Sequence, residues 1–356
     1  MKLVIQIPVL NERDTIAAVL DDLPRSIPGI SDICILIIDD GCTDDTIRIA
    51  LKHGADHIVK HTSNKGLAAA YQTGIDTALK LGADIIVNTD GDHQYPGSEI
   101  PRLVEPILQG KADVVIGDRQ VQQLEHFSPL KKWLQHLGSS VVRWASDTDV
   151  PDTVSGFRAL SREAALRTFV TTDFSYTVES LIQAGKRRLT VATVPIRTNF
   201  VDRPSKLHRG NWNFVKRQAA TIARTYATYE PLKTFSYISG FFLLLATLLL
   251  GRAAYVFIGR RLDLLSASND QSLMIGGALL IMAFIAFLIG LLADRVRSGQ
   301  RVSEEVLYRV RAMQVEQEAW QRALRSQLDE LEARQSRLEA HASDTGVAAQ
   351  AGELNG

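Results

Sequence analysis

Pairs of acidic side chains follow two strand-length apolar runs in the first hundred residues. Asp39 and Asp40 come directly after one run, and Asp90 and Asp92 come just after another. Carboxylates one residue apart on a turn can share Mg²⁺ or Mn²⁺, which prefer oxygen ligands and leave places for substrate phosphates. An Asp at a strand end can also accept a hydrogen bond from a base or a ribose hydroxyl. The pattern predicts a site for a metal ion and a nucleotide, whereas acids further along such turns only cap helices.

The segment Asn64-Lys65-Gly66 precedes a helix expected at 67–81. Lys65 and the helix N-terminus could bind phosphate, or the segment could be an ordinary helix start. The chain contains neither the G-x-x-x-x-G-K-[ST] nor the G-x-G-x-x-G pattern. The sequence therefore lacks the main motif expected of an ATPase or of a dinucleotide-binding protein.

Alternating apolar runs and helical patterns place these side chains. Strands are expected at 3–9, 33–38, 57–59, 85–87 and 114–116, and helices at 15–23, 45–52, 67–81 and 101–108. This alternation predicts an α/β domain with a mostly parallel sheet covered on both faces. Ligands bind such sheets beyond the carboxyl ends of the strands, so we expect the acidic turns to lie at one edge.

The composition argues against several classes of protein. The 356 residues carry 40 Lys or Arg and 40 Asp or Glu, so no overall charge favours nucleic acid as a partner. Cys34 and Cys42 have no metal-site spacing and imply no disulfide framework. Residues 1–10 are too short an apolar run for a signal peptide, so the front of the chain is expected to stay in the cytoplasm.

Two long apolar stretches predict transmembrane helices at 234–258 and 271–293. The basic segment 201–233 precedes them, and the stretch from Arg197 to Lys233 has eight Lys or Arg against two acids, a balance of +6. Basic residues flank both outer ends of the pair. We therefore expect a multi-pass protein of the inner or plasma membrane with its catalytic domain and C-terminus in the cytoplasm.

A charged helix is expected at 302–340, with apolar residues in alternating steps of four and three. It is either a short, imperfect coiled coil or a single amphipathic helix packed on the domain or the membrane. A homodimer or homotetramer through the spans and this helix is a hypothesis. Residues 343–356 are expected to be a disordered tail.

Several ordered motifs resemble a known family. They are Ile7-Pro8-Val9-Leu10-Asn11-Glu12, Asp39-Asp40-Gly41-Cys42-Thr43-Asp44, Asn64-Lys65-Gly66, Asp90-Gly91-Asp92, Gly117-Asp118-Arg119 and Asp152-Thr153-Val154-Ser155-Gly156-Phe157-Arg158. Over about residues 1–230 the chain resembles family 2 glycosyltransferases of GT-A fold, and among them the polyprenyl-phosphate type, which includes dolichyl-phosphate mannose synthase and bactoprenol glucosyltransferases. A GT-A domain at 1–200 is thus expected. The family usually has Ser at the position of Cys42 and often Ala at that of Gly91.

The resemblance implies a role for each matching position. Asp152, Asp92 and Arg158 would be catalytic, and Asp90, Asp92 and Gln94 would bind Mg²⁺ or Mn²⁺. The nucleotide-sugar would be bound by Pro8, Glu12, Asp39, Asp40, Lys65, Asp90, Gln94 and Arg119. The acceptor lipid would be bound by Arg197, Arg203, Lys206 and Arg209. Glu179, a weaker candidate base, is expected on a helix surface.

The implied reaction is metal-dependent, inverting transfer of a sugar from a UDP- or GDP-sugar to a polyprenyl phosphate for the cell envelope. A processive membrane polysaccharide synthase is an alternative, but the Gln-x-x-Arg-Trp block of those enzymes is missing around Arg143-Trp144. A transferase acting on another acceptor is a second alternative. A non-catalytic scaffold is a third, which the retained motif acids argue against.

Overall fold

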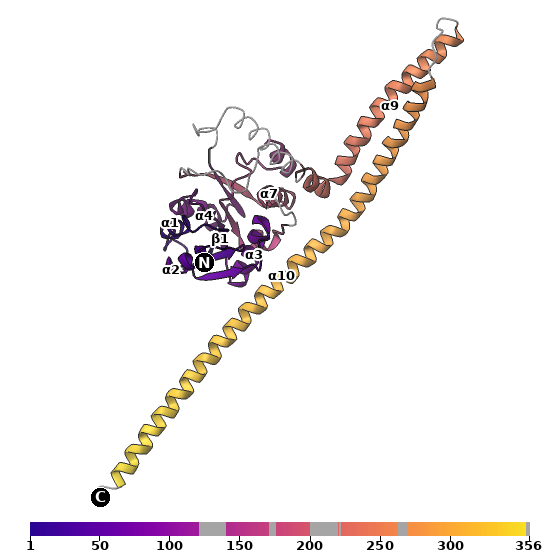
Figure 1. The fold of residues 1–356 in the computed structure, drawn as a ribbon. Helices are drawn as coiled ribbons and strands as arrows, with labels where there is room; N and C mark the ends of the chain where they lie inside the picture. Colours follow the sequence, from indigo (N-terminus) through magenta and orange to yellow (C-terminus); the bar gives the residue numbers. More distant parts are fainter. Residues whose placement is uncertain (121–139, 171–175, 200–219, 221, 263–269, 354–356) are drawn as a thin grey trace.

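The computed structural model describes residues 1–120, 140–170, 176–199, 220, 222–262 and 270–353. A seven-stranded sheet forms the centre of its α/β domain (Figure 1). The strands are β1 (Lys2–Val9), β2 (Asp32–Asp39), β3 (His57–Lys60), β4 (Ile85–Asn88), β5 (Val114–Asp118), β6 (Arg158–Ser161) and β7 (Val191–Pro195). They lie in the order β3-β2-β1-β4-β6-β5-β7, and only the two pairs that involve β6 are antiparallel. The predicted mostly parallel sheet is confirmed.

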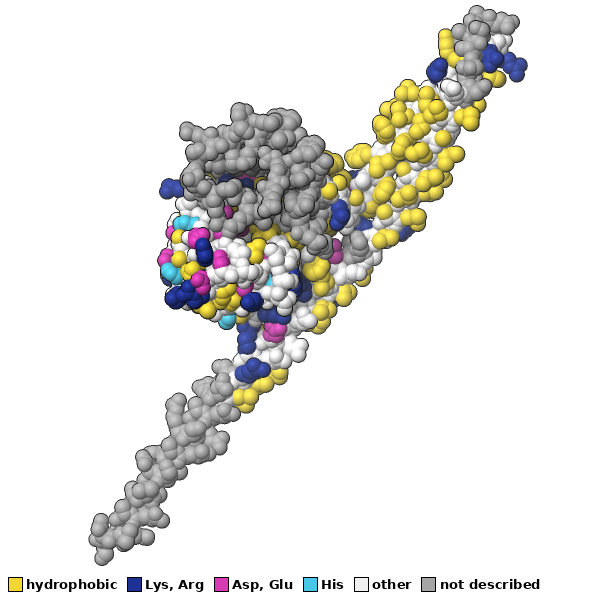
Figure 2. Space-filling view, in the orientation of Figure 1, with side chains coloured by type: hydrophobic (Ala, Val, Ile, Leu, Met, Phe, Trp, Pro, Cys, Tyr) yellow, Lys and Arg dark blue, Asp and Glu magenta, His cyan; other side chains and the backbone are white. Residues whose placement is uncertain are grey.

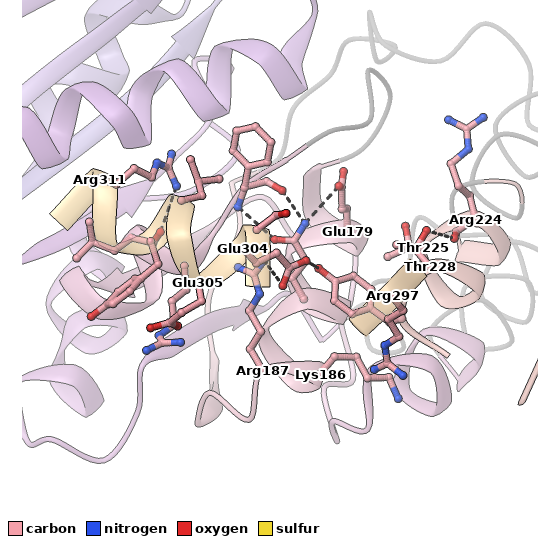
Figure 3. Close-up of a pocket in the computed structure, with 18 residues that line it drawn as sticks. Glu179, Lys186, Arg187, Arg224, Thr225, Thr228, Arg297, Glu304, Glu305 and Arg311 are labelled. Carbon is pink, nitrogen blue, oxygen red and sulfur yellow. Dashed lines mark hydrogen bonds and ion pairs between the residues drawn. The ribbon is translucent and has the colours of Figure 1, made fainter. Parts of the chain in front are cut away.

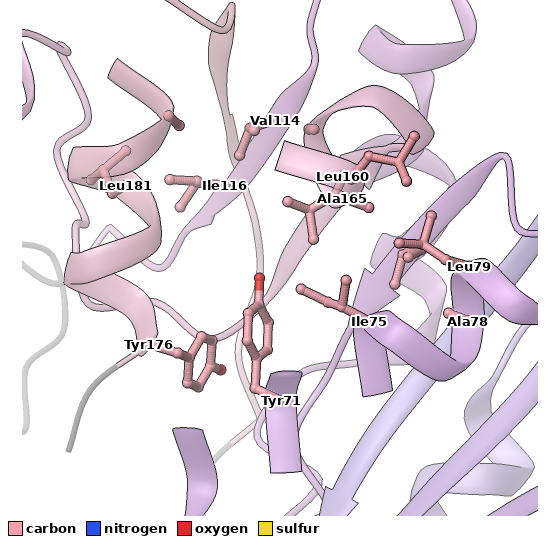
Figure 4. Packing of buried hydrophobic residues seen from close by; sticks show 14 of the residues in the cluster. Tyr71, Ile75, Ala78, Leu79, Val114, Ile116, Leu160, Ala165, Tyr176 and Leu181 are labelled. Atoms are coloured by element: carbon pink, nitrogen blue, oxygen red, sulfur yellow. The ribbon is translucent and has the colours of Figure 1, made fainter. Parts of the chain in front are cut away.

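Helices cover both faces of the sheet. They are α1 (Ile16–Asp22), α2 (Thr46–Lys52), α3 (Leu67–Lys80), the short 3-10 helix η1 (Gly97–Glu99), α4 (Ile100–Leu108), α6 (Arg162–Arg167) and α7 (Tyr176–Lys186). Successive strand side chains point to opposite faces, so Ile35 and Leu36 enter different cores. One core contains α3, α6 and α7, with Tyr71 and Tyr176 stacked at 3.9 Å between ring centroids (Figure 4). The other contains α1 and α4.

The reversed direction of β6 brings a distant segment to the carboxyl edge of the sheet. Arg158, the first residue of β6, pairs in register with Asn88, the last residue of β4. The residues just before β6 therefore lie beside the residues just after β4. Strands β6 and β7 have four and five residues and come from segments to which the sequence pattern assigned no element.

Two long helices follow the domain, α9 (Pro231–Arg261) and α10 (Asp270–Glu353), and they pack side by side as a hairpin (Figure 1). By length and composition, Pro231–Arg261 and Gln271–Arg325 are long and apolar enough to cross a membrane. Hydrophobic side chains cover the outside of the hairpin (Figure 2), as with Leu248 and Phe284, which are each 63% exposed. This exposure is unlike that of the core helices of a soluble domain.

Helix α10 continues without a break past the domain and packs on it. Tyr308 donates a hydrogen bond to Glu163 at 2.9 Å, and Arg311 donates to the carbonyl of Thr168 at 2.8 Å and pairs with Asp76. Val315 is buried in the core that contains α3. These contacts match the packed amphipathic helix, one of the two alternatives that the sequence left open.

The apolar stripe on the other side of α10, with Val306, Met313 and Trp320, is exposed. The helix extends through Glu353, where the sequence predicted a tail without regular structure. Ala348 and Ala349 are strong helix formers, which gives a local reason for this difference.

Gly74 on α3 tests how tightly the helix packs on the sheet. A Cβ atom there would lie 2.4 Å from Oε1 of Gln6 and 2.9 Å from Cδ1 of Ile38. We expect Gly74→Ala to lower the free energy of unfolding by about 1–3 kcal/mol despite the helix propensity of alanine. Gly299→Ala, where nothing lies within 4 Å of the added atom, is the control. Urea unfolding in detergent compares them, and equal stability of the two variants would contradict the packing.

Candidate active site

The acidic turns meet at the carboxyl edge of the sheet, as the sequence predicted. Strand β1 ends at Val9, which pairs in register with Asp39 at the end of β2. On its other side β1 pairs with β4, whose last residue lies two positions before Asp90. Parallel pairing therefore brings Asp39 and the Asp90–Asp92 turn to the two sides of the β1 end.

One carboxylate oxygen of Asp39 accepts no hydrogen bond from the described residues. Its side chain is only 1% exposed, and Oδ1 accepts hydrogen bonds from the backbone N–H groups of Gly41 at 3.1 Å and Cys42 at 2.7 Å. Oδ2 is buried with no hydrogen bond among the described residues, and Nζ of Lys60 lies 4.0 Å away. A buried acceptor left unpaired is costly, so a ligand N–H or hydroxyl at this place would be stabilising.

Asp40, in contrast, is fully engaged with the chain itself. Its Oδ1 accepts hydrogen bonds from the backbone N–H of Lys65 and contacts Nδ1 of His61, both at 2.8 Å, and its Oδ2 accepts from the N–H of Gly66 at 2.9 Å. The side chain is 4% exposed. Of the two acids that end β2, the structure leaves only Asp39 with an open acceptor.

Asp90 and Asp92 form a turn suited to a hard cation. Oδ1 of Asp92 accepts the backbone N–H of Gln94 at 3.0 Å, and the hydroxyl of Thr15 donates to the carbonyl of Gly91 at 2.7 Å. Burial and the neighbouring Asp92 carboxylate raise the pKa of Asp90 to about 7. A divalent cation would relieve this crowding of negative charge.

Among the described residues, no group of three or more His, Cys, Asp or Glu side chains could hold a metal ion alone. A site with one or two carboxylates fits Mg²⁺ or Mn²⁺ when substrate phosphates supply further ligands. The carboxylates of Asp90 and Asp92 are thus compatible with the predicted metal as part of a shared site, and the predicted role of Gln94 as a ligand stays a prediction.

Two other predicted site residues pair with each other. Arg119, just after β5, donates from Nε and Nη2 to the two carboxylate oxygens of Asp152, at 2.7 Å and 3.0 Å. Asp152 is 2% exposed. Burial opposes the charge of Arg119, but Tyr95 and Asp152 together raise the pKa of its guanidinium. Such a bidentate pair holds the Asp152 segment against the end of β5.

Arg158 is buried at the start of β6, beside the end of β4. Its guanidinium donates to the carbonyls of Ser155 at 2.8 Å, Thr177 at 2.7 Å and Thr153 at 2.9 Å, and to the hydroxyl of Ser180 at 2.9 Å. Burial lowers its pKa. These contacts favour a role in holding the loop before β6 over direct contact with a phosphate.

The remaining predicted residues have different surroundings. Pro8 is buried within β1, and Glu12 accepts a hydrogen bond from the hydroxyl of Thr15 at 3.2 Å, beside the Asp90–Asp92 turn. Lys65 and Arg197 are exposed. The other acceptor-side predictions lie outside the described residues; they are Arg203, Lys206 and Arg209.

Several polar residues that support this edge of the sheet were not predicted from the sequence. Asn88 accepts a hydrogen bond from Gln6 at 2.9 Å and donates to the carbonyl of Gly156 at 2.9 Å, so it joins β1, β4 and the loop before β6. Tyr95 stacks on Phe157 at 5.1 Å between ring centroids. A polar residue that closes an apolar run, as Asn88 does, was the available signal.

A cavity of about 630 Å³ lies away from this edge, where α7, α10 and the segment 222–229 meet (Figure 3). Arg187 pairs with Glu304 there at 3.1 Å. Glu179 lines the cavity and is 3% exposed, so its assignment to a helix surface was wrong. The cause is that α7 is covered by the segments that lead to and from the hairpin.

Comparisons with known proteins agree with this geometry. The family model described as glycosyl transferase family 2 matches residues 4–169. The chain is 32% identical over 201 residues to an uncharacterized protein of Methanocaldococcus jannaschii, which covers 55% of this chain and 81% of that protein. It is 29% identical over 218 residues to the UDP-N-acetylglucosamine–dolichyl-phosphate N-acetylglucosaminyltransferase of Methanococcus voltae, which covers 55% of this chain and 85% of that one.

The fold is similar to that of glucosyl-3-phosphoglycerate synthase from Mycobacterium tuberculosis, solved in complex with phosphoglyceric acid. The TM-score is 0.50 at 21% identity, and the match covers 64% of this chain and 79% of that one. At this identity the likeness concerns the fold alone.

The raised pKa of Asp90 predicts a pH-dependent stability in metal-free buffer. The carboxyl titrates near 7 in the folded chain against 3.8 in the reference state, so its stabilising protonation is lost as pH rises through 7. We expect Asp90→Asn to unfold later than the parent chain at pH 8 with EDTA, by about 1 kcal/mol or roughly 2–4 °C. At pH 5 the two chains should be closer.

The control for this measurement is Asp45→Asn, whose exposed carboxylate pairs with Arg48 at 2.9 Å and has a lowered pKa. It should gain no stability at pH 8. Thermal unfolding in detergent from pH 5 to pH 8 checks both variants. An Asp90→Asn variant that melts with the parent chain at every pH would show that the crowding of charge is absent.

Proposed function

Because this chain belongs to glycosyl transferase family 2, we propose that it transfers a sugar from a UDP- or GDP-sugar to a polyprenyl phosphate at the membrane surface. Glycosyl transfer is the activity of the family, and the relative from Methanococcus voltae is named for transfer from UDP-N-acetylglucosamine to dolichyl phosphate. The observation that carries the proposal is the meeting of Asp39, the Asp90–Asp92 turn and the Arg119–Asp152 pair at one sheet edge.

The donor is placed by the acids at this edge. The open Oδ2 of Asp39 accepts a hydrogen bond from the base or the ribose. Asp90, Asp92 and Gln94 would hold Mg²⁺ or Mn²⁺, with the diphosphate supplying further oxygen ligands. The cation, when bound, neutralises the charge that develops on the nucleoside diphosphate as it leaves. The side chains of Asp90, Asp92 and Gln94 position the diphosphate beside the ends of β1 and β4.

The acceptor needs little help from a base. A phosphate monoester has its second pKa at about 6 and is anionic near neutral pH, so its oxygen can attack the anomeric carbon directly, with inversion. Both oxygens of Asp152 are bound by Arg119, which makes Asp152 better suited to orient this arginine than to remove a proton. Arg119, held in place by Asp152, then supplies a fixed positive charge that stabilises the phosphate groups in the transition state.

The helical hairpin anchors the catalytic domain to the membrane. Helices α9 and α10 span the bilayer, and their basic flanks at Lys233, Arg295 and Arg297 keep the domain and the C-terminus in the cytoplasm. Arg260 and Arg261 at the far loop oppose this orientation but are outnumbered. Arg197 and the basic segment that follows it attract the lipid phosphate at roughly 1 kcal/mol for each basic residue near the surface.

A direct assay tests the activity. The full chain in detergent is incubated with undecaprenyl or dolichyl phosphate and a panel of labelled UDP- and GDP-sugars. We expect one acid-labile, singly glycosylated lipid, which forms with Mn²⁺ or Mg²⁺ and is absent with EDTA. Asp92→Asn should lower the rate at least about 100-fold because it removes a charge at the diphosphate.

Asp45→Asn is again the matched control, because Asp45 is an exposed acid at the N-terminal end of α2 that pairs with Arg48, and it should keep full activity. A polymer that grows on the lipid would indicate a polysaccharide synthase instead. Cellular function that survives Asp92→Asn would indicate a scaffold, and equal labelling with EDTA would remove the metal from the proposal.

A further inference from the structure

We propose that His61 is a positioning residue for the nucleotide end of the donor site and that it acts through Asp40. The inference rests on the proposed function, which uses Asp39 at this end. His61 follows β3 and is 5% exposed, so it is a buried titratable side chain for which the proposed reaction has no direct use.

Both ring nitrogens of His61 are engaged. Nδ1 lies 2.8 Å from Oδ1 of Asp40, and Nε2 lies 3.0 Å from the hydroxyl of Thr73 on α3. A carboxylate only accepts hydrogen bonds, so Nδ1 carries the ring proton and donates a hydrogen bond to Asp40. In the neutral ring Nε2 then accepts from Thr73. The imidazole therefore bridges the end of β2 and the first turns of α3.

Through this bridge, Asp40 holds the loop at 61–66. The carboxylate receives the backbone N–H groups of Lys65 and Gly66, which lie 25 and 26 residues further along the chain. A Cβ atom at Gly41 would lie 2.9 Å from the backbone nitrogen of Asn64, so the two turns pack backbone to backbone. Asp40 is thus the centre of a joint between two loops, and His61 fixes the orientation of its carboxylate.

The two loops joined by Asp40 contain residues that lie at the proposed nucleotide site. The backbone N–H of His61 donates to the carbonyl of Asp39 at 2.9 Å, and Lys60 extends toward the open oxygen of Asp39. Lys65 and the N-terminus of α3 lie at the other end of the loop. A shift of this loop would move both sides of the nucleotide site together, and a misplacement of about 1 Å is enough to weaken a preorganised site.

Three substitutions separate positioning from simple burial. His61→Leu keeps the bulk and removes both hydrogen bonds. His61→Asn keeps a donor near the position of Nδ1, and Thr73→Val removes only the contact with Nε2. His53→Leu is the control, because His53 makes the same 2.8 Å contact from Nδ1 to an Asp, Asp21, on the surface at the C-terminal ends of α1 and α2.

The measurements are the dissociation constants of UDP and GDP with Mn²⁺, the KM values for donor and lipid, and amide hydrogen exchange at Lys65 and Gly66. For His61→Leu we expect weaker nucleotide binding and a higher donor KM, both by about tenfold, with kcat and the lipid KM within about twofold. Exchange at the two amides should accelerate. His61→Asn should restore most of the binding, Thr73→Val should fall between, and His53→Leu should match the parent chain.

Two outcomes overturn the inference. His61→Leu could lower the melting temperature and leave the donor KM and the exchange at Lys65 and Gly66 unchanged, which would make His61 a packing residue only. If His61→Leu does not fold, Thr73→Val decides: a donor KM equal to that of the parent chain, without faster exchange at Lys65 and Gly66, has the same meaning. If the parent chain binds neither nucleotide and labels no lipid, the proposed function is contradicted instead. The exchange rates at Lys65 and Gly66 in the variants then test separately whether His61 positions the loop through Asp40.

Discussion

The buried guanidinium of Arg158 makes the hydrogen bonds on which the geometry of the candidate site depends. It gathers three backbone carbonyls and one hydroxyl from the loop before β6 and from α7. An arginine in this position cannot give up its proton easily and cannot reach water, so the loop must stay closed around it. Because Arg158 stands opposite Asn88 in the sheet, this loop is held directly beside the end of β4.

The loop before β6 also packs closely against the side chains of Asp90 and Tyr176. A Cβ atom at Gly156 would lie 2.8 Å from the hydroxyl of Tyr176 and 3.1 Å from Oδ2 of Asp90, so only glycine fits between them. The adjacent Asp152 is tied to Arg119 on the other side. The loop before β6 is therefore fixed at both ends.

Helix α10 connects the hairpin to the domain as one continuous element. Within the hairpin, Ser239 of α9 donates to the carbonyl of Ala283 at 2.8 Å. At the domain, Glu304 receives the hydroxyl of Tyr229 at 3.3 Å and pairs with Arg187. A helix rises about 1.5 Å per residue and resists bending, so these contacts fix the height of the domain relative to the apolar part of the hairpin. For a transferase with a lipid acceptor, that height determines how far the acceptor phosphate must reach.

Sequence alone determined the strands β1 to β5, the helices between them and the edge of the sheet at which the acids gather. Strand and helix periods are local properties, and parallel strands necessarily end on the same side, so Asp39, Asp90 and Asp92 could be placed together before any coordinates were known. The short strands β6 and β7 gave too little pattern to predict. Their pairing depends on contacts with distant strands.

Only the tertiary structure decided which polar atoms remain open for a ligand. Asp39 and Asp40 are adjacent and look equivalent in the sequence, yet one keeps an unpaired oxygen and the other is consumed by groups 21 to 26 residues away. Likewise, Asp152 meets Arg119 across 33 residues. A hydrogen bond requires two groups within about 3 Å, and which groups come that close is set by the fold and not by their neighbours in the chain.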